Sequence, residues 1–247
     1  MKKSCIFLSL VLFNIIFFTF IVTGNNTENK VQNQNLTEAR KMEAANLNLI
    51  CLRYRYSNPR KCIIYGNQLL AVSQKLNDLK KTIISNNIIG NAYHDLGLND
   101  SAMYYYKVSL SFSDKIQNKN FIAKAYNNIG EVKRIYGKYP EALDYHLKAL
   151  EFFTALKDSD GISTSLNLLG NVNRDIGESD KAFAYYNQAL EISQKLYDTI
   201  EVANTLINMG NYFFFKKDIN KAYENYLNAL SLCHMLNYKT EMADLEN

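Results

Sequence analysis

The side chains of this sequence that offer binding chemistry are mainly amides, which recur at helical spacing. Asn87, Asn91 and His94 follow one another by four and three residues, which places them on one stripe of a helix. Because an amide carries both a hydrogen-bond donor and an acceptor, such a stripe can hold the backbone of an extended peptide without reading its sequence. The candidate binding residues in this and the later stripes are Asn87, Asn91, His94, Lys124, Asn127, Glu131, Arg134, Asn167, Asn171, Arg174 and Asn211.

Charged and apolar side chains in the stripes would add to the binding. Each amide hydrogen bond contributes only about 0.5–1.5 kcal/mol net, so the amides alone would bind weakly. Arg134 and Arg174 carry guanidinium groups that can hold a carboxylate through two parallel hydrogen bonds, and Phe214 offers an apolar contact. We therefore predict a groove for a peptide or protein. The alternative is that a chain rich in asparagine throughout merely solvates this face.

Catalytic and metal-binding arrangements are not found in the sequence. The histidines His94, His146 and His234 are spread along the chain. His94 adjoins Asp95, but adjacent residues of a helix point about 100° apart and do not face each other. No glycine-rich phosphate loop follows a strand pattern, and the cysteines lack the paired spacing of a metal site. We predict a protein without catalytic residues, metal or cofactor.

The elements that position these side chains recur with a period of 40 residues. Apolar residues such as Ile89, Ala92 and Leu96 repeat at three- and four-residue steps, which predicts a helix. Gly97 can end that helix in the left-handed conformation, and Pro140 marks the start of a second helix. The recurring small residues are Gly90, Gly130, Gly170, Gly210, Gly97, Gly137, Gly177, Ala102, Ala142, Ala182 and Ala222, with Lys217 at the fourth turn.

Small and aromatic residues predict how the two helices of each unit pack. Gly90 and Ala102 would let the two helix backbones approach closely. Aromatic runs follow the alanines, as at 104–106 and 185–186, and we expect them to fill the seam between neighbouring hairpins.

The pattern formed by Gly90, Tyr93, Gly97, Ala102 and Tyr106 resembles the tetratricopeptide repeat. This resemblance implies an all-α, right-handed superhelical solenoid of helix hairpins, whose first helices line a concave face that binds a peptide or protein partner. The period is 40 residues rather than about 34, and tryptophan is absent. This longer variety is similar to kinesin light chains and to the peptide-sensing and periplasmic-sensor regions of bacterial regulators.

The repeat array is predicted over residues 41–247. Its units span about 43–82, 83–122, 123–162, 163–202 and 203–242. The first unit carries Ile50 in place of glycine, as is typical of a terminal cap. A sixth unit is expected to start before residue 247, because Glu241–Leu245 resembles residues 201–205. This half-helix either covers the fifth hairpin as a short lid or starts a longer array, and the flank that it leaves open predicts self-association.

The N-terminal residues have the features of a targeting segment. Two lysines precede a mainly apolar run from Ile6 to Val22, and polar sequence resumes at Gly24. We predict a secretory signal peptide over residues 1–24, or an uncleaved membrane anchor, followed by a flexible tether over residues 25–40. Both alternatives place the repeats outside the cytoplasm, in the periplasm or the extracellular space.

Composition and cysteine content limit the class of partner. The chain has 28 basic and 24 acidic residues, a net charge of +4 that is spread along the array. We expect no nucleic-acid partner, because a phosphate-binding face needs clustered lysine and arginine. Cys51 and Cys62 fall on facing helices of the first hairpin, so they form either a disulfide or, as we favour, two buried thiols.

Two functions are consistent with these features. We predict an exported, non-catalytic scaffold that binds a protein or peptide through an asparagine-lined groove. The alternative is an extracytoplasmic sensor region of a membrane signalling or transcription regulator, with its transmembrane and output domains beyond residue 247.

Overall fold

The structure is a computed structural model that describes residues 33–55 and 57–245, with side chains through Met235. The predicted signal or anchor over 1–24 lies outside the described residues. The described chain consists of helices with no strand, as predicted. They are a helix over residues 33–54, α2 (Pro59–Lys75), α3 (Leu79–Asp95), α4 (Asn99–Lys115), α5 (Lys119–Ile135), α6 (Tyr139–Leu156), α7 (Ser159–Asp175), α8 (Ser179–Lys195), α9 (Thr199–Phe215) and α10 (Ile219–Leu245).

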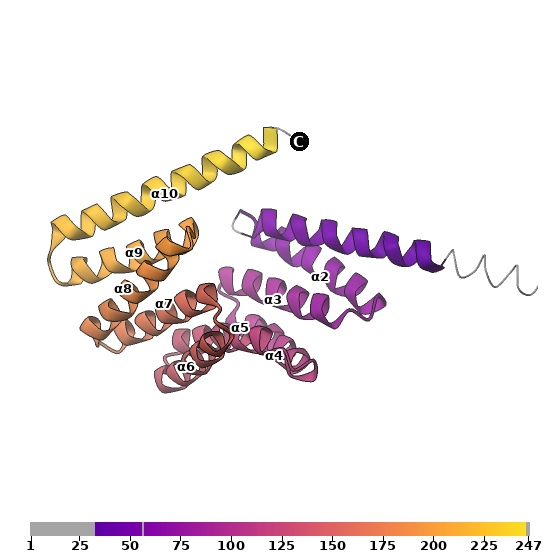
Figure 1. Cartoon of the computed structure of the whole chain (residues 1–247), viewed down its shortest axis with the longest axis horizontal. Coiled ribbons are helices and arrows are strands. Elements are labelled where there is room, and N and C mark those ends of the chain that lie inside the picture. The colour runs from indigo at the N-terminus through magenta and orange to yellow at the C-terminus, as the bar shows by residue number, and fades with distance from the viewer. Residues whose placement is uncertain (1–32, 56, 246–247) are drawn as a thin grey trace, which may run out of the picture.

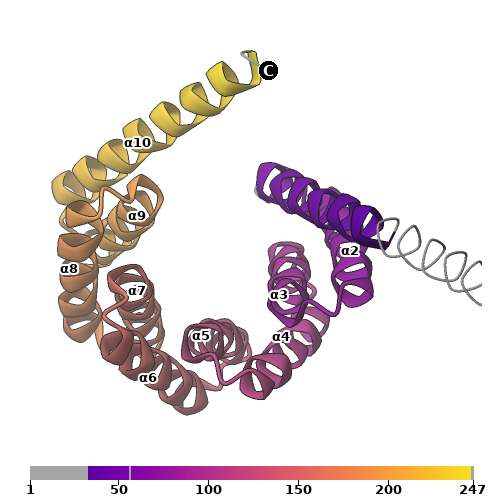
Figure 2. The same ribbon diagram turned by 45° about the vertical axis from the view of Figure 1, so that its right-hand side comes forward.

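The helices pair into hairpins that stack into an open, curved solenoid (Figure 1). Each first helix from α3 onward begins 40 residues after the previous one, and so does each second helix from α4 onward. Figure 2 shows α3, α5, α7 and α9 on the inner side of the curve and α4, α6, α8 and α10 on the outer side. The predicted all-α repeat solenoid is therefore confirmed, and the first helices form its concave face.

Side-chain caps define where the first helices begin. Asp78, Asn118, Asp158 and Asp198 each accept a hydrogen bond from a backbone N–H in the first turn of the helix that follows. The hairpins consequently start four residues earlier than the predicted units, at 79 rather than 83 for α3. The caps recur every 40 residues, so the sequence contained this signal.

Left-handed residues make the turns inside and between hairpins. Gly97, Gly137 and Gly177 follow the first helices with φ of 73°, 71° and 88°, which confirms the predicted helix ends. Lys217 adopts the same conformation in the last hairpin, with φ 63°. The turns between hairpins also use it, but at non-glycine positions: Asn77, Gln117, Lys157 and Tyr197.

The glycine of each first helix packs against a ring of the second helix, not against the alanine that we expected. A Cβ atom added at Gly90 would lie 2.6 Å from the ring of Tyr106, and one at Gly130 would lie 2.7 Å from His146. The ring must sit there because it also contacts the next hairpin, where Tyr106 packs with Ile129. The predicted aromatic seam also includes further rings, such as Phe183 stacked on Tyr212 of the next hairpin, whereas Tyr104 is 63% exposed.

The two ends of the described array differ from the sequence interpretation. Residues 33–40, predicted as flexible tether, belong to the helix over 33–54, where Lys41 forms an ion pair with Glu38 at 2.8 Å. At the other end, α10 continues through Leu245, so the residues expected to start a sixth unit extend the second helix of the fifth. Position 238, equivalent to the caps of the other hairpins, is tyrosine, which cannot cap a new helix.

Replacing Gly130 by leucine should destabilise the fold by about 2 kcal/mol, because the new side chain meets the His146 ring. Lys124→Leu is the matched control, since Lys124 is exposed on the same helix and its replacement should change stability by less than about 0.5 kcal/mol. Urea unfolding followed by circular dichroism measures both. Equal midpoints for the two variants would show that the ring does not need this glycine.

Candidate functional site

The concave face contains a hollow between the inner helices α7 and α9. Its volume is about 310 Å³. The hollow is lined by Thr164, Asn167, Leu168, Asn171, Glu201, Asn204, Ile207 and Asn208. Two of these, Asn167 and Asn171, belong to the predicted stripe. Ile207 stands in α9 at the position of the stripe that Asn167 holds in α7. The other five were missed, although Asn204 and Asn208 are four residues apart and could have been identified by the same spacing argument.

Three amides of the predicted stripe are each held by a tyrosine hydroxyl. The Oδ1 atoms of Asn91, Asn171 and Asn211 accept hydrogen bonds from Tyr106, Tyr186 and Tyr226 at 2.8, 2.9 and 2.7 Å. Burial raises the pKa of Tyr186 to about 12, so the phenol stays a donor at neutral pH. Among the described residues the NH2 groups of these three amides have no partner. This arrangement keeps one donor available from each amide.

Two other predicted amides connect one hairpin to the next. Asn127 donates to Ser165 at 2.9 Å, and Asn167 donates to Thr205 and Glu201 at 2.6 Å each. Both asparagines are only 5% exposed. These two amides are therefore part of the contact between hairpins rather than free groups of the groove, because neighbouring inner helices approach closely enough for the side chains to bond.

Asn87 occupies the same position in α3 but lacks the corresponding bond. The residue 38 positions later, where Asn127 and Asn167 find a hydroxyl, is Ala125. The Oδ1 atom of Asn87 is buried without a partner, and so is that of Asn167. The equivalent oxygen of Asn127 is satisfied by the Nδ1 atom of His146 at 3.1 Å.

The two arginines of the stripe are already paired inside the protein. Arg134 donates to both carboxylate oxygens of Glu131, at 2.9 and 2.7 Å, and also to Asp175. Arg174 donates to Asp175 at 3.0 Å and to Asn208 at 3.4 Å. Burial acts to raise the pKa of Glu131, but the hydrogen bonds from Arg134 outweigh it and hold that pKa below its usual range. The guanidinium groups that we expected to hold a ligand carboxylate thus have internal carboxylate partners.

The remaining predicted residues lie at the margins of the face. The Nδ1 atom of His94 is 3.1 Å from the Oδ1 atom of Asn99, at the turn into α4. Lys124 is exposed on α5, where its charge acts on Asp160 of α7. Neither residue lines the hollow between α7 and α9.

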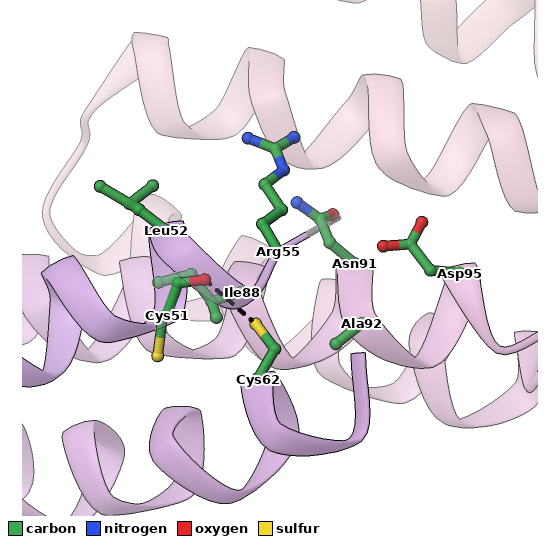
Figure 3. Close-up of a pocket in the computed structure, with 8 residues that line it drawn as sticks. All are labelled: Cys51, Leu52, Arg55, Cys62, Ile88, Asn91, Ala92 and Asp95. Atoms are coloured by element: carbon green, nitrogen blue, oxygen red, sulfur yellow. Dashed lines mark hydrogen bonds between the residues drawn. The ribbon is translucent and has the colours of Figure 1, made fainter. Parts of the chain in front are cut away.

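The two cysteines of the first hairpin surround a small cavity of about 30 Å³ (Figure 3). Both thiols are free and buried, as favoured from the sequence. The Sγ atom of Cys62 donates to the carbonyl oxygen of Cys51 at 3.7 Å. Arg55, Asn91 and Asp95 lie on one side of the pair in Figure 3. The cavity has room for about one water molecule, so it is a packing feature rather than a ligand pocket.

Two features are absent from the described residues. No group of three or more histidine, cysteine or acidic side chains in that part of the chain could hold a metal ion. None of the helices described is both long and apolar enough to span a bilayer.

Comparisons with known proteins agree with this geometry. Residues 121–195 match the family described as tetratricopeptide repeat. No curated protein matches the sequence significantly. Residues 121–195 thus carry the tetratricopeptide-repeat pattern, and the array as a whole has the solenoid fold of such repeats, as the sequence pattern predicted.

Several solved structures share the fold. BtubC (BKLC) from P. vanneervenii is 21% identical, with a TM-score of 0.56 over 81% of this chain and 92% of that one. The apo form of RapI is 17% identical, with a TM-score of 0.60 over 80% and 85%. A Rap protein complexed with Competence and Sporulation Factor is 16% identical, with a TM-score of 0.63 over 81% and 66%. Because the sequence identities are low, these structures show that the fold is shared and nothing further about this chain.

Protonation of His146 should destabilise the protein below neutral pH. His146 is fully buried, and burial lowers its pKa from 6.5 to about 4, because its Nε2 atom has no partner for a second proton. The folded pKa lies below the unfolded one, so this contribution is present above pH 6.5 and is lost as the pH falls toward 4. Between pH 7 and pH 5 the loss should be about 2 kcal/mol.

Urea unfolding of the wild type and of His146→Phe at the two pH values tests this expectation. Phenylalanine fills the same site without titrating, so the variant should lose about 2 kcal/mol less than the wild type over this interval. Carboxylates titrate in both proteins and cancel in the comparison. An identical loss of stability in the wild type and the variant would show that His146 is not the group responsible.

Proposed function

We propose that this protein is a non-catalytic scaffold that holds an extended segment of a peptide or protein partner on its concave face. The observation that carries the proposal is the set of amides held by tyrosine hydroxyls: Asn91, Asn171 and Asn211. Their free NH2 groups are donors for the backbone carbonyls of a partner. The fold shared with a Rap protein complexed with Competence and Sporulation Factor supports a binding role for the array.

The α7–α9 part of the face is where we place the partner. Asn171 and Asn211 lie on successive inner helices there, whereas α5 has Glu131 at the equivalent position, engaged by Arg134. Ile207 and Phe214 of α9 are 40% and 56% exposed and offer apolar contacts beside the amides. At about 0.5–1.5 kcal/mol per hydrogen bond, the amides need these contacts to reach a useful affinity.

We further propose that the protein acts outside the cytoplasm. This proposal is supported by the sequence of residues 1–24, which has the features of a signal peptide or an anchor.

A sensor region of a membrane regulator is the second candidate function. It is favoured by the outer flank of α10, where Tyr223, Leu227 and Leu230 are exposed. The equivalent Phe183 and Leu190 of α8 are packed with Met209 of α9, so the flank suits a further stacked unit or a second copy.

Replacing Asn171 and Asn211 together by alanine should weaken peptide binding while leaving the helical fold intact. The probe is an acetylated and amidated peptide, Ser-Ala-Ser-Arg-Ser-Ala-Ser, titrated into the full chain by calorimetry, with circular dichroism on the same samples. We expect a loss of about 2- to 12-fold per hydrogen bond. By contrast, the double Asn127→Ala and Asn167→Ala variant should lower stability, because it removes the bonds between hairpins.

A matched control replaces Asn187 and Asn220, which are exposed on the outer helices, by alanine. This double variant should bind the peptide as the wild type does. Unchanged affinity in the Asn171 and Asn211 variant would remove these amides from the binding face.

Export is tested by adding protease to intact spheroplasts of an expressing bacterial host. The repeats should be degraded while a cytoplasmic marker survives, since residues 1–24 would direct them across the membrane. Full protection of the repeats until lysis would contradict the proposed location.

A further inference from the structure

The carboxylate of Glu201 lines the hollow between α7 and α9 without a cationic partner. Glu201 lies in the first turn of α9 and accepts a hydrogen bond from Asn167 at 2.6 Å. Within the described part of the chain, no lysine, arginine or histidine nitrogen forms an ion pair with it. The equivalent residues of α3, α5 and α7 are Lys81, Phe121 and Gly161, so among these inner helices only α9 carries a carboxylate here.

Two other carboxylates of the concave face are neutralised by internal partners. Glu131 and Asp175 form ion pairs with Arg134, and Asp175 also pairs with Arg174. Glu201 instead has acidic neighbours, because Asp160 and Asp198 both act on it with the same sign of charge. Burial and these neighbours raise the pKa of Glu201, although hydrogen bonds with Asn167 and Asn204 oppose the shift.

Glu201 is partly buried, so its carboxylate loses hydration that no counter-charge in the described chain replaces, and a cation beside it would offset that cost. The hollow measures about 310 Å³, roughly ten times the volume that one water molecule occupies. It can therefore admit a long side chain. Leu168 and Ile207 offer apolar surface to the methylene groups of such a side chain, and the Oδ1 atom of Asn167, which has no partner among the described residues, can accept a hydrogen bond from its charged end.

We propose that this hollow is a subsite for a cationic side chain, lysine or arginine, of the bound partner. Glu201 provides the negative charge, and the Oδ1 atom of Asn167 provides an acceptor for a remaining N–H group of the ligand. The subsite rests on the proposed function, since it selects one residue of the segment that the amides of α7 and α9 hold. A cationic ligand group is the opposite of the carboxylate that the sequence predicted for Arg134 and Arg174. The guanidinium groups of these two arginines bind internal carboxylates instead.

The test uses three acetylated and amidated peptides, Ser-Ala-Ser-X-Ser-Ala-Ser, in which X is arginine, its neutral isostere citrulline, or glutamate. Calorimetry with the full chain should show the arginine peptide binding at least about 5-fold more tightly than the citrulline peptide, and the glutamate peptide most weakly. Glu201→Gln should bind the arginine and citrulline peptides equally, with unchanged helicity. The control Glu191→Gln removes the same charge from α8, where Glu191 is exposed and paired with Lys195, and should keep the preference.

The outcomes separate this proposal from the proposed function. Equal affinity of the wild type for all three peptides would leave the scaffold function standing and overturn the cationic subsite. Preference for arginine that survives in Glu201→Gln would also overturn it.

If none of the peptides binds, the proposal that the concave face holds an extended peptide is wrong. The cationic subsite is then tested with a smaller probe. N-acetylarginine amide should then shift the side-chain amide signals of Asn167 and Asn204 in the wild type but not in Glu201→Gln, with N-acetylcitrulline amide as the neutral control. Absence of that shift would overturn the subsite as well.

Discussion

The regular hairpins depend on one contact, between a glycine of the inner helix and a ring of the outer helix. At Gly90 and Gly210 even a methyl group would lie 2.6 Å from the tyrosine ring, so only glycine lets the ring reach this depth. At that depth the phenol hydroxyl reaches the residue after the glycine, as Tyr106 reaches Asn91. The same contact therefore closes the hairpin and orients an amide on the concave face. Packing and binding chemistry cannot be varied independently in this array.

The third hairpin shows how the array behaves when this combination changes. His146 replaces tyrosine against Gly130 and contacts Asn127 instead of the residue after the glycine. That residue is Glu131, which turns to Arg134. Through Arg134 and Asp175 the ion pairs extend to α7, so this part of the concave face is connected by internal charge pairs. The α5–α6 hairpin, which has Glu131 in place of the amide, thus contributes ion pairs to the concave face, whereas its neighbours contribute amide donors without a partner among the described residues.

Periodicity made the fold predictable, whereas the state of each binding group depended on residues one repeat away. The 40-residue spacing indicates helix, turn and helix because glycine, proline and apolar steps act locally. Asn127 is bonded because residue 165, in the next repeat, carries a hydroxyl, whereas Asn87 lacks this bond because residue 125 is alanine. The sequence of one repeat alone does not reveal this difference. The same holds for Arg134, whose partner Asp175 comes 41 residues later. The stripe could be located from sequence, but its unpaired members could not.

Selectivity on the concave face follows from which charges lack an internal partner rather than from which charges are present. Arg134 and Arg174 would attract an acidic ligand if they were isolated, but Glu131 and Asp175 already satisfy their forks. Displacing those pairs would leave buried carboxylates unpaired, at a cost that a ligand carboxylate would have to offset. Glu201 requires no such displacement, because its hydrogen-bond partners among the described residues are the neutral amides of Asn167 and Asn204. The face therefore presents negative charge to a ligand at α9, although the chain as a whole carries a net positive charge.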